Sequence, residues 1–193
     1  MENQIIIKQR IKNFQNASIN VAGDKSLSIR FIIFSSLAKG KSYAKNLLMS
    51  EDVVNAINCI KKLGIKIQIS KNICCVFGKG LGGYTYKKNL LLDAGNSGTT
   101  ARLLIASLID TTHKIKITGD KSLKKRDMLR IIKPLSKMGA KFKSTNGRLP
   151  LSIFKSKKFI PIKYFENLGS AQCKSAIMIA GLKILSASLY WIL

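Results

Sequence analysis

The segments that decide the fold are GDKSLSIR at residues 23–30, GNSGTTAR at residues 95–102 and GSAQCKSA at residues 169–176. They begin 72 residues apart (95 − 23) and 74 residues apart (169 − 95), each where an apolar helix pattern starts. A fourth segment, GDKSLKKR at residues 119–126, repeats the first five letters of the first. The near-constant spacing indicates an internal structural repeat.

The repeated segments have the chemistry of anion sites. A helix N-terminus offers unpaired backbone N–H groups and a partial positive charge, which favour phosphate or carboxylate. Each segment also carries lysine or arginine, and an arginine adds planar, two-pronged recognition. Several such helix ends, if they converge, would hold a substrate with more than one anionic group.

The residues between these segments predict the same order of elements twice. In the first unit we expect a helix, a strand, a helix capped by Ser50 and two strands, at residues 27–37, 42–47, 50–63, 65–69 and 73–77. In the second unit we expect a strand, a helix, a strand, a helix and two strands, at residues 90–92, 99–109, 113–118, 124–138, 140–144 and 149–154. Lys39-Gly40 is expected to separate the first helix from its strand.

The fold class expected from this order is α/β, built from repeated β-α-β-α-β-β units at about residues 21–90 and 91–160, with a partial third unit at 161–193. A single unit cannot bury both faces of its helices. The copies should therefore pack their apolar helices together and place their sheets outside. A third unit that stops after its first helix indicates an incomplete domain.

Composition narrows the function only partly. The net charge of +25 is compatible with nucleic-acid binding, attraction to anionic membranes or steering of anionic metabolites. Aromatic residues are few and are not interleaved with cations, which argues against a nucleic-acid-binding module. The four cysteines lack a CxxC pair, so we expect reduced thiols in a cytoplasmic protein, with no disulfide framework and no metal site. Lys183 interrupts the apolar residues 176–193, which argues against a membrane span.

The four motifs together, in the order GDKSLSIR, LDAGNSGTTARLL, GDKSLKKR and GSAQCKSA, closely resemble the 3-phosphoshikimate 1-carboxyvinyltransferase family, the 5-enolpyruvylshikimate-3-phosphate synthases. The resemblance covers roughly residues 20 to 182. It implies the enolpyruvyl transferase fold, in which two domains each contain three β-α-β-α-β-β units. Residues 1–20 would then belong to the other, missing domain, and residues 21–193 would form one incomplete domain of two.

The activity implied by the resemblance is transfer of the enolpyruvyl group from phosphoenolpyruvate to the 5-hydroxyl of shikimate 3-phosphate, with release of phosphate, in aromatic amino acid biosynthesis. The implied partners are small anionic substrates, with no cofactor, nucleic acid or membrane, and the full-length enzyme would be monomeric. The family's catalytic carboxylates match no residue here, so no catalytic residue is identifiable. We expect the chain to be inactive unless a missing C-terminal half complements it.

Motif matching assigns substrate contacts residue by residue. The residues expected to bind shikimate 3-phosphate are Lys25, Ser26, Arg30, Ser170, Ala171 and Gln172. Those expected near phosphoenolpyruvate are Lys25, Asn96, Gly98, Arg126 and Gln172, with Arg102 and Lys174 as supports. Each has a simpler alternative, because serines 26 and 170 could cap helices, glycine 98 could serve packing, and arginine 126 could be a solvated charge.

Two departures from the family pattern are Ala22 and Asp127, each at a position where the family usually has proline. Asp127 could weaken an anion site by pairing with Arg126 or by repulsion. After Lys183 the family pattern disappears. The alternatives left open are a relative of the UDP-N-acetylglucosamine enolpyruvyl transferases, whose usual loop cysteine is not recognisable here, and a basic nucleic-acid-binding module.

Overall fold

The computed structural model describes residues 21–165 and 169–184 of the 193-residue chain. The expected segment of the other domain at 1–20 and residues 185–193 of the divergent tail lie outside the described residues. The helices are α1 (Lys25–Leu37), α2 (Glu51–Lys62), α3 (Gly98–Ser107), α4 (Lys121–Lys125), α5 (Leu129–Lys137) and α6 (Ala171–Leu182). The strands are β1 (Lys39–Lys45), β2 (Lys66–Ser70), β3 (Ile73–Lys79), β4 (Leu90–Asp93), β5 (Ile115–Thr118), β6 (Lys141–Thr145) and β7 (Arg148–Phe154).

The two sheets repeat one topology. The first has the strand order β1-β3-β2, with both pairs antiparallel. The second has the order β4-β5-β7-β6, in which β5, β7 and β6 repeat the first arrangement and β4 adds a parallel strand beside β5. The predicted internal repeat and the α/β class are therefore confirmed.

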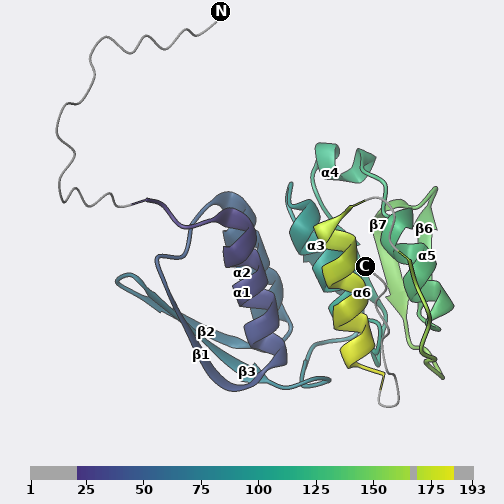
Figure 1. Ribbon diagram of the computed structural model, residues 1–193, viewed down its shortest axis with the longest axis horizontal. Coiled ribbons are helices and arrows are strands. Elements are labelled where there is room, and N and C mark those ends of the chain that lie inside the picture. The colour runs from purple at the N-terminus through teal and green to yellow at the C-terminus, as the bar shows by residue number, and fades with distance from the viewer. Residues whose placement is uncertain (1–20, 166–168, 185–193) are drawn as a thin grey trace, which may run out of the picture.

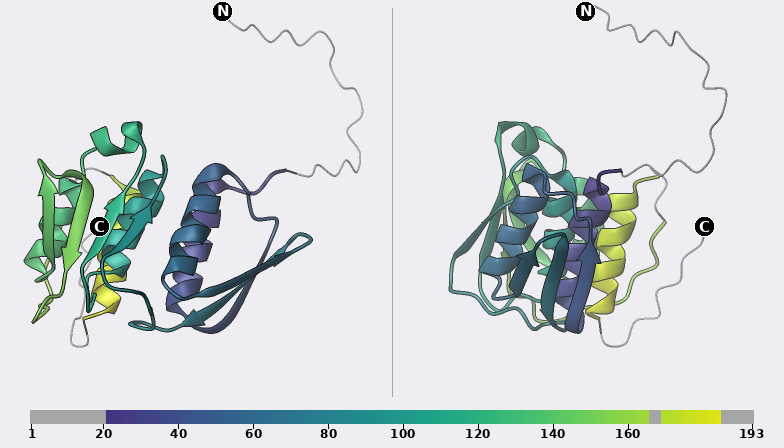
Figure 2. Two further views of the ribbon diagram at one scale, coloured as in Figure 1. Left: turned by 180° about the vertical axis from the view of Figure 1, so that it is seen from behind. Right: turned by 90° about the vertical axis from the view of Figure 1, so that its left-hand side faces the viewer.

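The helices lie between the sheets, as the repeat predicts. Figures 1 and 2 show the first sheet on one side of the molecule and the second on the other, with α1, α2, α3 and α6 side by side between them. Ile32 of α1 and Leu104 of α3 have no exposed surface, and Ala176 of α6 has none either. Burying such side chains contributes about 1.5–3 kcal/mol for each large one. No helix of the described residues is both long and apolar enough to cross a bilayer.

The helix expected over 124–138 is wrong as a single element, because the chain forms α4 and α5 with a turn between them. Arg126 leaves the helical conformation (φ −76°, ψ 142°) and ends α4. The Asp127 carboxylate accepts from Leu129 N at 2.6 Å, and Met128 N donates to Gly147 O at 2.8 Å. An aspartate side chain that accepts from the backbone N–H two residues later forms a turn, and this turn breaks the helix locally although the apolar pattern is continuous.

Three smaller expectations also need correction. The first strand begins at Lys39 instead of residue 42, because β1 pairs with β3 from Lys39 opposite Lys79 onward. The expected stop at Lys39-Gly40 is therefore inside the strand. Ser50 occupies the N-cap of α2 but makes no side-chain cap hydrogen bond. In the third unit, expected at about 161–193, the described residues contain one regular element, α6.

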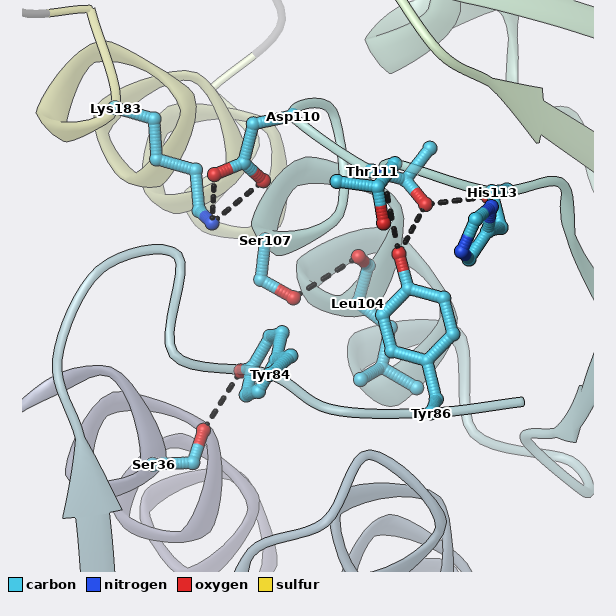
Figure 3. A network of polar contacts seen from close by, with 10 residues as sticks. Ser36, Tyr84, Tyr86, Leu104, Ser107, Asp110, Thr111, His113 and Lys183 are labelled. Atoms are coloured by element: carbon cyan, nitrogen blue, oxygen red, sulfur yellow. Dashed lines mark hydrogen bonds and ion pairs between the residues drawn. The ribbon is translucent and has the colours of Figure 1, made fainter. Parts of the chain in front are cut away.

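A polar network joins the three units at the end of the molecule where α3 and α6 finish (Figure 3). Lys183, which caps the C-terminus of α6, donates to both carboxylate oxygens of Asp110 at 2.7 and 2.8 Å. The ammonium also lies 5.7 Å from the centre of the Tyr84 ring. The Tyr84 hydroxyl is 2.7 Å from that of Ser36 in α1. The lysine that interrupts the apolar C-terminal sequence is thus a buried structural contact.

Candidate anion-binding site

The repeated glycine-led segments all lead into helices, as their sequences predict. Asp24 caps α1 by accepting from Leu27 N at 2.7 Å, and Ser97 caps α3 by accepting from Thr100 N at 3.1 Å. Ser170 caps α6 by accepting from Cys173 N at 3.3 Å. Gly95 needs its φ of +57° for the turn before α3, a conformation that glycine adopts without strain. The capping alternative therefore describes Ser170 correctly, whereas the cap of α1 is Asp24 and not Ser26.

A pocket of about 520 Å³ opens where the starts of four helices meet. Its walls come from the first turns of α1, α2, α3 and α6 and from the turn after α4. The lining residues are Lys25, Ser26, Glu51, Asp52, Asn96, Ser97, Gly98, Thr99, Arg126 and Gln172. Four helix N-termini directed at one space add their partial positive charges there, which favours an anionic ligand.

Most of the residues selected by motif matching meet at this pocket. Lys25, Ser26, Asn96, Gly98, Arg126 and Gln172 line it, although they come from segments up to 147 positions apart (172 − 25). Arg30, Ser170 and Ala171 do not line it. Arg30 lies one turn behind Ser26 and donates to its hydroxyl and, at 3.3 Å, to its carbonyl oxygen. Arg30 can therefore orient Ser26.

Two acidic residues of the pocket, Glu51 and Asp52 in the first turn of α2, were not among the residues expected at the site. Asp52 forms an ion pair with Lys25, with 3.0 Å between the ammonium nitrogen and Oδ2. The Lys25 side chain is 55% exposed and that of Asp52 17%. At such exposure the pair contributes little to stability. It holds the ammonium at the pocket, where an arriving anion would share it.

Arg126 lines the pocket and contacts Asn96, another residue that the motifs predicted at the site. Its Nη2 donates to Asn96 Oδ1 at 2.7 Å. Within the described residues Asp127 makes no ion pair with Arg126, and its carboxylate accepts from the backbone N–H of Leu129 instead. The expected weakening of this arginine by pairing is therefore not seen. Arg126 is exposed, as the solvated-charge alternative expects, and its guanidinium also contacts Asn96 at the pocket.

A second arginine lies behind the pocket wall. Arg102 Nη1 donates to Gln172 Oε1 at 2.5 Å, and Gln172 Nε2 donates to Thr99 Oγ1 at 2.9 Å. Burial lowers the pKa of Arg102 below its usual value, and the nearby charge of Arg126 acts in the same direction. The role of Thr99 had no signal in the sequence beyond its place in the first turn of a helix.

Gly98 is required by the close approach of two guanidinium groups. A Cβ at this position would lie 2.7 Å from Arg102 Nη1 and 3.3 Å from Arg126 Nη1. The first distance is too short for any side chain, so a substitution would displace Arg102. Two guanidinium groups therefore lie next to Gly98, as the packing alternative expects, and the expectation that Gly98 leaves space for a substrate stays a prediction.

Comparison with known proteins identifies the family of the chain. The family model of EPSP synthase (3-phosphoshikimate 1-carboxyvinyltransferase) matches residues 9–185. The chain belongs to the EPSP synthase family. The matched family favours the phosphoshikimate interpretation over the UDP-N-acetylglucosamine alternative.

Individual EPSP synthase relatives show how much of a family member's length this chain spans. The 3-phosphoshikimate 1-carboxyvinyltransferase of Thermoanaerobacter sp. (strain X514) is 43% identical over 177 residues, which are 91% of this chain and 41% of the relative. That of Sulfurihydrogenibium sp. (strain YO3AOP1) is 44% identical over 90% of this chain and 40% of the relative. The chain therefore spans about 40% of the length of these curated relatives.

A solved structure supports the fold assignment. The EPSP synthase from Acinetobacter baumannii matches with a TM-score of 0.80 and 37% sequence identity. The match covers 86% of this chain and 38% of that protein. The enolpyruvyl transferase fold expected from the motifs is therefore confirmed, with this chain corresponding to part of the complete architecture.

Proposed function

We propose that this chain binds shikimate 3-phosphate and phosphoenolpyruvate in the pocket, and that it contributes this part of the site to transfer of the enolpyruvyl group to the 5-hydroxyl of shikimate 3-phosphate. The observation that carries the proposal is the convergence of four helix N-termini with Lys25, Arg126 and Gln172 on one pocket. The printed name of the relatives, 3-phosphoshikimate 1-carboxyvinyltransferase, gives the substrate class.

The proposed contacts follow the motif matches. Lys25 lies between the two substrates and contacts both. The further contacts to shikimate 3-phosphate are Ser26, Arg30, Ser170, Ala171 and Gln172. The further contacts to phosphoenolpyruvate are Asn96, Gly98, Arg126 and Gln172. Arg30 acts partly through Ser26, and Ser170 through the N-terminus of α6 that it caps. A phosphate at a helix N-terminus accepts backbone N–H bonds that the helix itself leaves unused.

The chemistry of the reaction explains why cations surround the pocket. The methylene carbon of phosphoenolpyruvate is protonated while the 5-hydroxyl gives up its proton and attacks C2. Phosphate then leaves C2 of the tetrahedral intermediate and the methyl group loses a proton, which restores the carbon–carbon double bond. Two anions must first be brought together, and Lys25 and Arg126 reduce their repulsion while the pocket orients them. The reaction also needs a proton donor and a proton acceptor. We assign no catalytic residue to this chain, because Asp52 is paired with Lys25 and no motif match supports Glu51.

The remaining parts of the proposal concern what completes the site. We propose that residues 1–20 belong to the second domain of the fold, and that the proton-transfer groups come from the part of the family protein outside this chain. A complementing C-terminal half would then restore activity in a monomeric, two-domain assembly. The chain alone binds substrates without turning them over.

Binding to the isolated chain tests the proposal directly. Isothermal titration should show shikimate 3-phosphate binding at least about tenfold more tightly than shikimate, because one charge-assisted hydrogen bond to the phosphate contributes about that much. Arg126→Gln should weaken phosphoenolpyruvate binding, and the matched control Arg148→Gln, at an exposed arginine that does not line the pocket, should not. Equal affinity for shikimate and its phosphate would refute the assignment.

Complementation tests the activity. The chain should be mixed with the C-terminal remainder of the Thermoanaerobacter relative, and phosphate release measured with both substrates present. We expect release from the mixture and none from either part alone. Release by this chain alone would show that the proton donor and acceptor lie within it, and would contradict the assignment of catalysis to the other half.

A further inference from the structure

We propose that Arg102 is a positioning residue that decides which end of the Gln172 side-chain amide faces the pocket. Arg102 itself does not line the pocket, whereas Gln172 does. The functional part of this inference rests on the anion-binding role proposed above. The contacts that carry it do not depend on that role.

Arg102 determines the orientation of the amide because a guanidinium group has donors only. Its Nη1 lies 2.5 Å from Gln172 Oε1, so the oxygen must be the atom that faces it. The amide nitrogen is then directed to the other side, where it donates to Thr99 Oγ1 at 2.9 Å. Arg102 and Thr99 thus hold the two ends of the amide in one orientation.

The orientation matters for an anion because the two ends of an amide have opposite polarity. The nitrogen of Gln172 carries two N–H donors, of which Thr99 accepts one. The second is the group that Gln172 can offer to a phosphate or carboxylate in the pocket. If the amide were reversed, Gln172 would present a carbonyl oxygen, which repels an anion.

The contact of the second terminal guanidinium nitrogen of Arg102 explains why arginine, and not lysine, suits this position. Its Nη2 donates to the backbone oxygen of Asp127 at 3.2 Å, in the turn between α4 and α5. That turn also carries Arg126, which contacts Asn96. Through these two contacts Arg102, which is in α3, joins α3 to the start of α6 and to the turn between α4 and α5. A lysine ammonium lacks the rigid fork needed to hold both partners in fixed directions.

The absence of a side chain at Gly98 makes the arrangement possible. Gly98 and Arg102 are four residues apart on α3, so they lie on the same helix face. A Cβ at Gly98 would lie 2.7 Å from Arg102 Nη1. Gly98→Ala should therefore disturb the Gln172 amide through Arg102, in addition to any direct effect on a ligand.

Nuclear magnetic resonance of the ¹⁵N-labelled 193-residue chain tests this inference. The side-chain NH₂ signals of Gln172 are identified by their loss in Gln172→Ala. We expect these signals to shift in Arg102→Met and Arg102→Lys, and to remain unchanged in the control Arg148→Met. The shift is measured without any ligand, so it tests the contact independently of the proposed function.

Titration of the same samples with inorganic phosphate and with shikimate 3-phosphate tests the consequence. We expect Arg102→Lys to weaken binding about tenfold, although it keeps the charge, because one oriented donor is lost. In the Gln172→Ala background Arg102→Lys should cause no further loss, since Arg102 acts through Gln172. Arg102→Met is compared in the same way.

Three results would overturn the inference. Unchanged Gln172 NH₂ signals in both Arg102 variants would show that Arg102 does not orient the amide. Wild-type affinity in Arg102→Lys would show that Arg102 contributes charge alone. An equal loss in Arg102→Lys with and without the Gln172 side chain would show that Arg102 does not act through Gln172. If the wild-type chain bound neither ligand, the proposed function would fail, while the NH₂ signals would still decide the Arg102–Gln172 contact. If Arg102→Met did not fold, Arg102→Lys and Gln172→Ala would provide the same comparison.

Discussion

Replacing Asp110 by alanine leaves the Lys183 ammonium buried without its counter-ion. In the native chain the ammonium nitrogen lies 2.7 and 2.8 Å from the two carboxylate oxygens. The Lys183 side chain is 1% exposed, whereas the Asp110 side chain is 31% exposed. The lysine therefore depends on the carboxylate much more than the carboxylate depends on the lysine. Asp110→Ala should therefore lower the free energy of unfolding more than Lys183→Met does.

The magnitude follows from this asymmetry. Removing one partner of a buried ion pair costs about 3–5 kcal/mol. Since water reaches Asp110, we expect the lower part of that range or slightly less for Asp110→Ala, about 2–3 kcal/mol. Lys183→Met should cost about 1 kcal/mol, because the apolar side chain can pack and the remaining carboxylate is hydrated. The double variant should be about 1 kcal/mol more stable than Asp110→Ala, because it contains no buried unpaired charge.

Equilibrium unfolding in urea at pH 7, followed by far-ultraviolet circular dichroism, measures these differences. Lys61→Met is the matched control, since it changes an exposed lysine in the last turn of α2 and should alter stability by no more than about 0.5 kcal/mol. The reasoning would be refuted if Asp110→Ala were as stable as this control. It would also be refuted if the double variant were less stable than Asp110→Ala.

Two further predictions concern Tyr84 and the cysteines. Burial raises the pKa of the Tyr84 hydroxyl from 10 to about 12. The buried neutral side chain therefore contributes fully to the free energy of unfolding below pH 10, and this contribution is lost as the pH rises to 12. The loss is about 3 kcal/mol at most. Urea unfolding between pH 9 and 11.5 should show a smaller decrease in the free energy of unfolding for Tyr84→Phe than for the wild type. Equal decreases would contradict the burial argument. Cys75 is partly exposed, whereas Cys59, Cys74 and Cys173 are buried. A small thiol reagent followed by peptide mass spectrometry should find Cys75 modified first, and earlier modification of Cys59, whose pKa burial raises to about 12, would contradict the structure.

Local signals in the sequence predicted most of the elements of this chain. The glycine-led segments mark the starts of α1, α3 and α6 because a turn followed by a capping side chain is encoded within a few residues. The β2–β3 hairpin follows from β-branched runs separated by a short turn. The division between α4 and α5 was missed because the turn formed by the Asp127 carboxylate and Leu129 N competes with a continuous apolar pattern. Sequence periodicity does not reveal which of the two dominates.

The candidate site was only partly predictable. Lys25, Asn96 and Arg126 were identifiable from their motifs, and the structure places all three at one pocket. Asp52 was missed because its contact with Lys25 joins the starts of two helices that become neighbours only after packing. Lys183 appeared to be an interruption of an apolar segment because its partner, Asp110, lies 73 positions earlier.

By itself, the sequence determined the repeat, the places where α1, α3 and α6 begin and the family to which the chain belongs, because these depend on residues close together in the chain or on whole motifs. Only the tertiary structure decided that α1, α2, α3 and α6 direct their N-termini to one pocket, and that Arg102 contacts Gln172 while Lys183 contacts Asp110. The physical reason is that electrostatic and hydrogen-bonding partners are selected by distance in space. Packing of the buried helices sets those distances, and no local pattern encodes them.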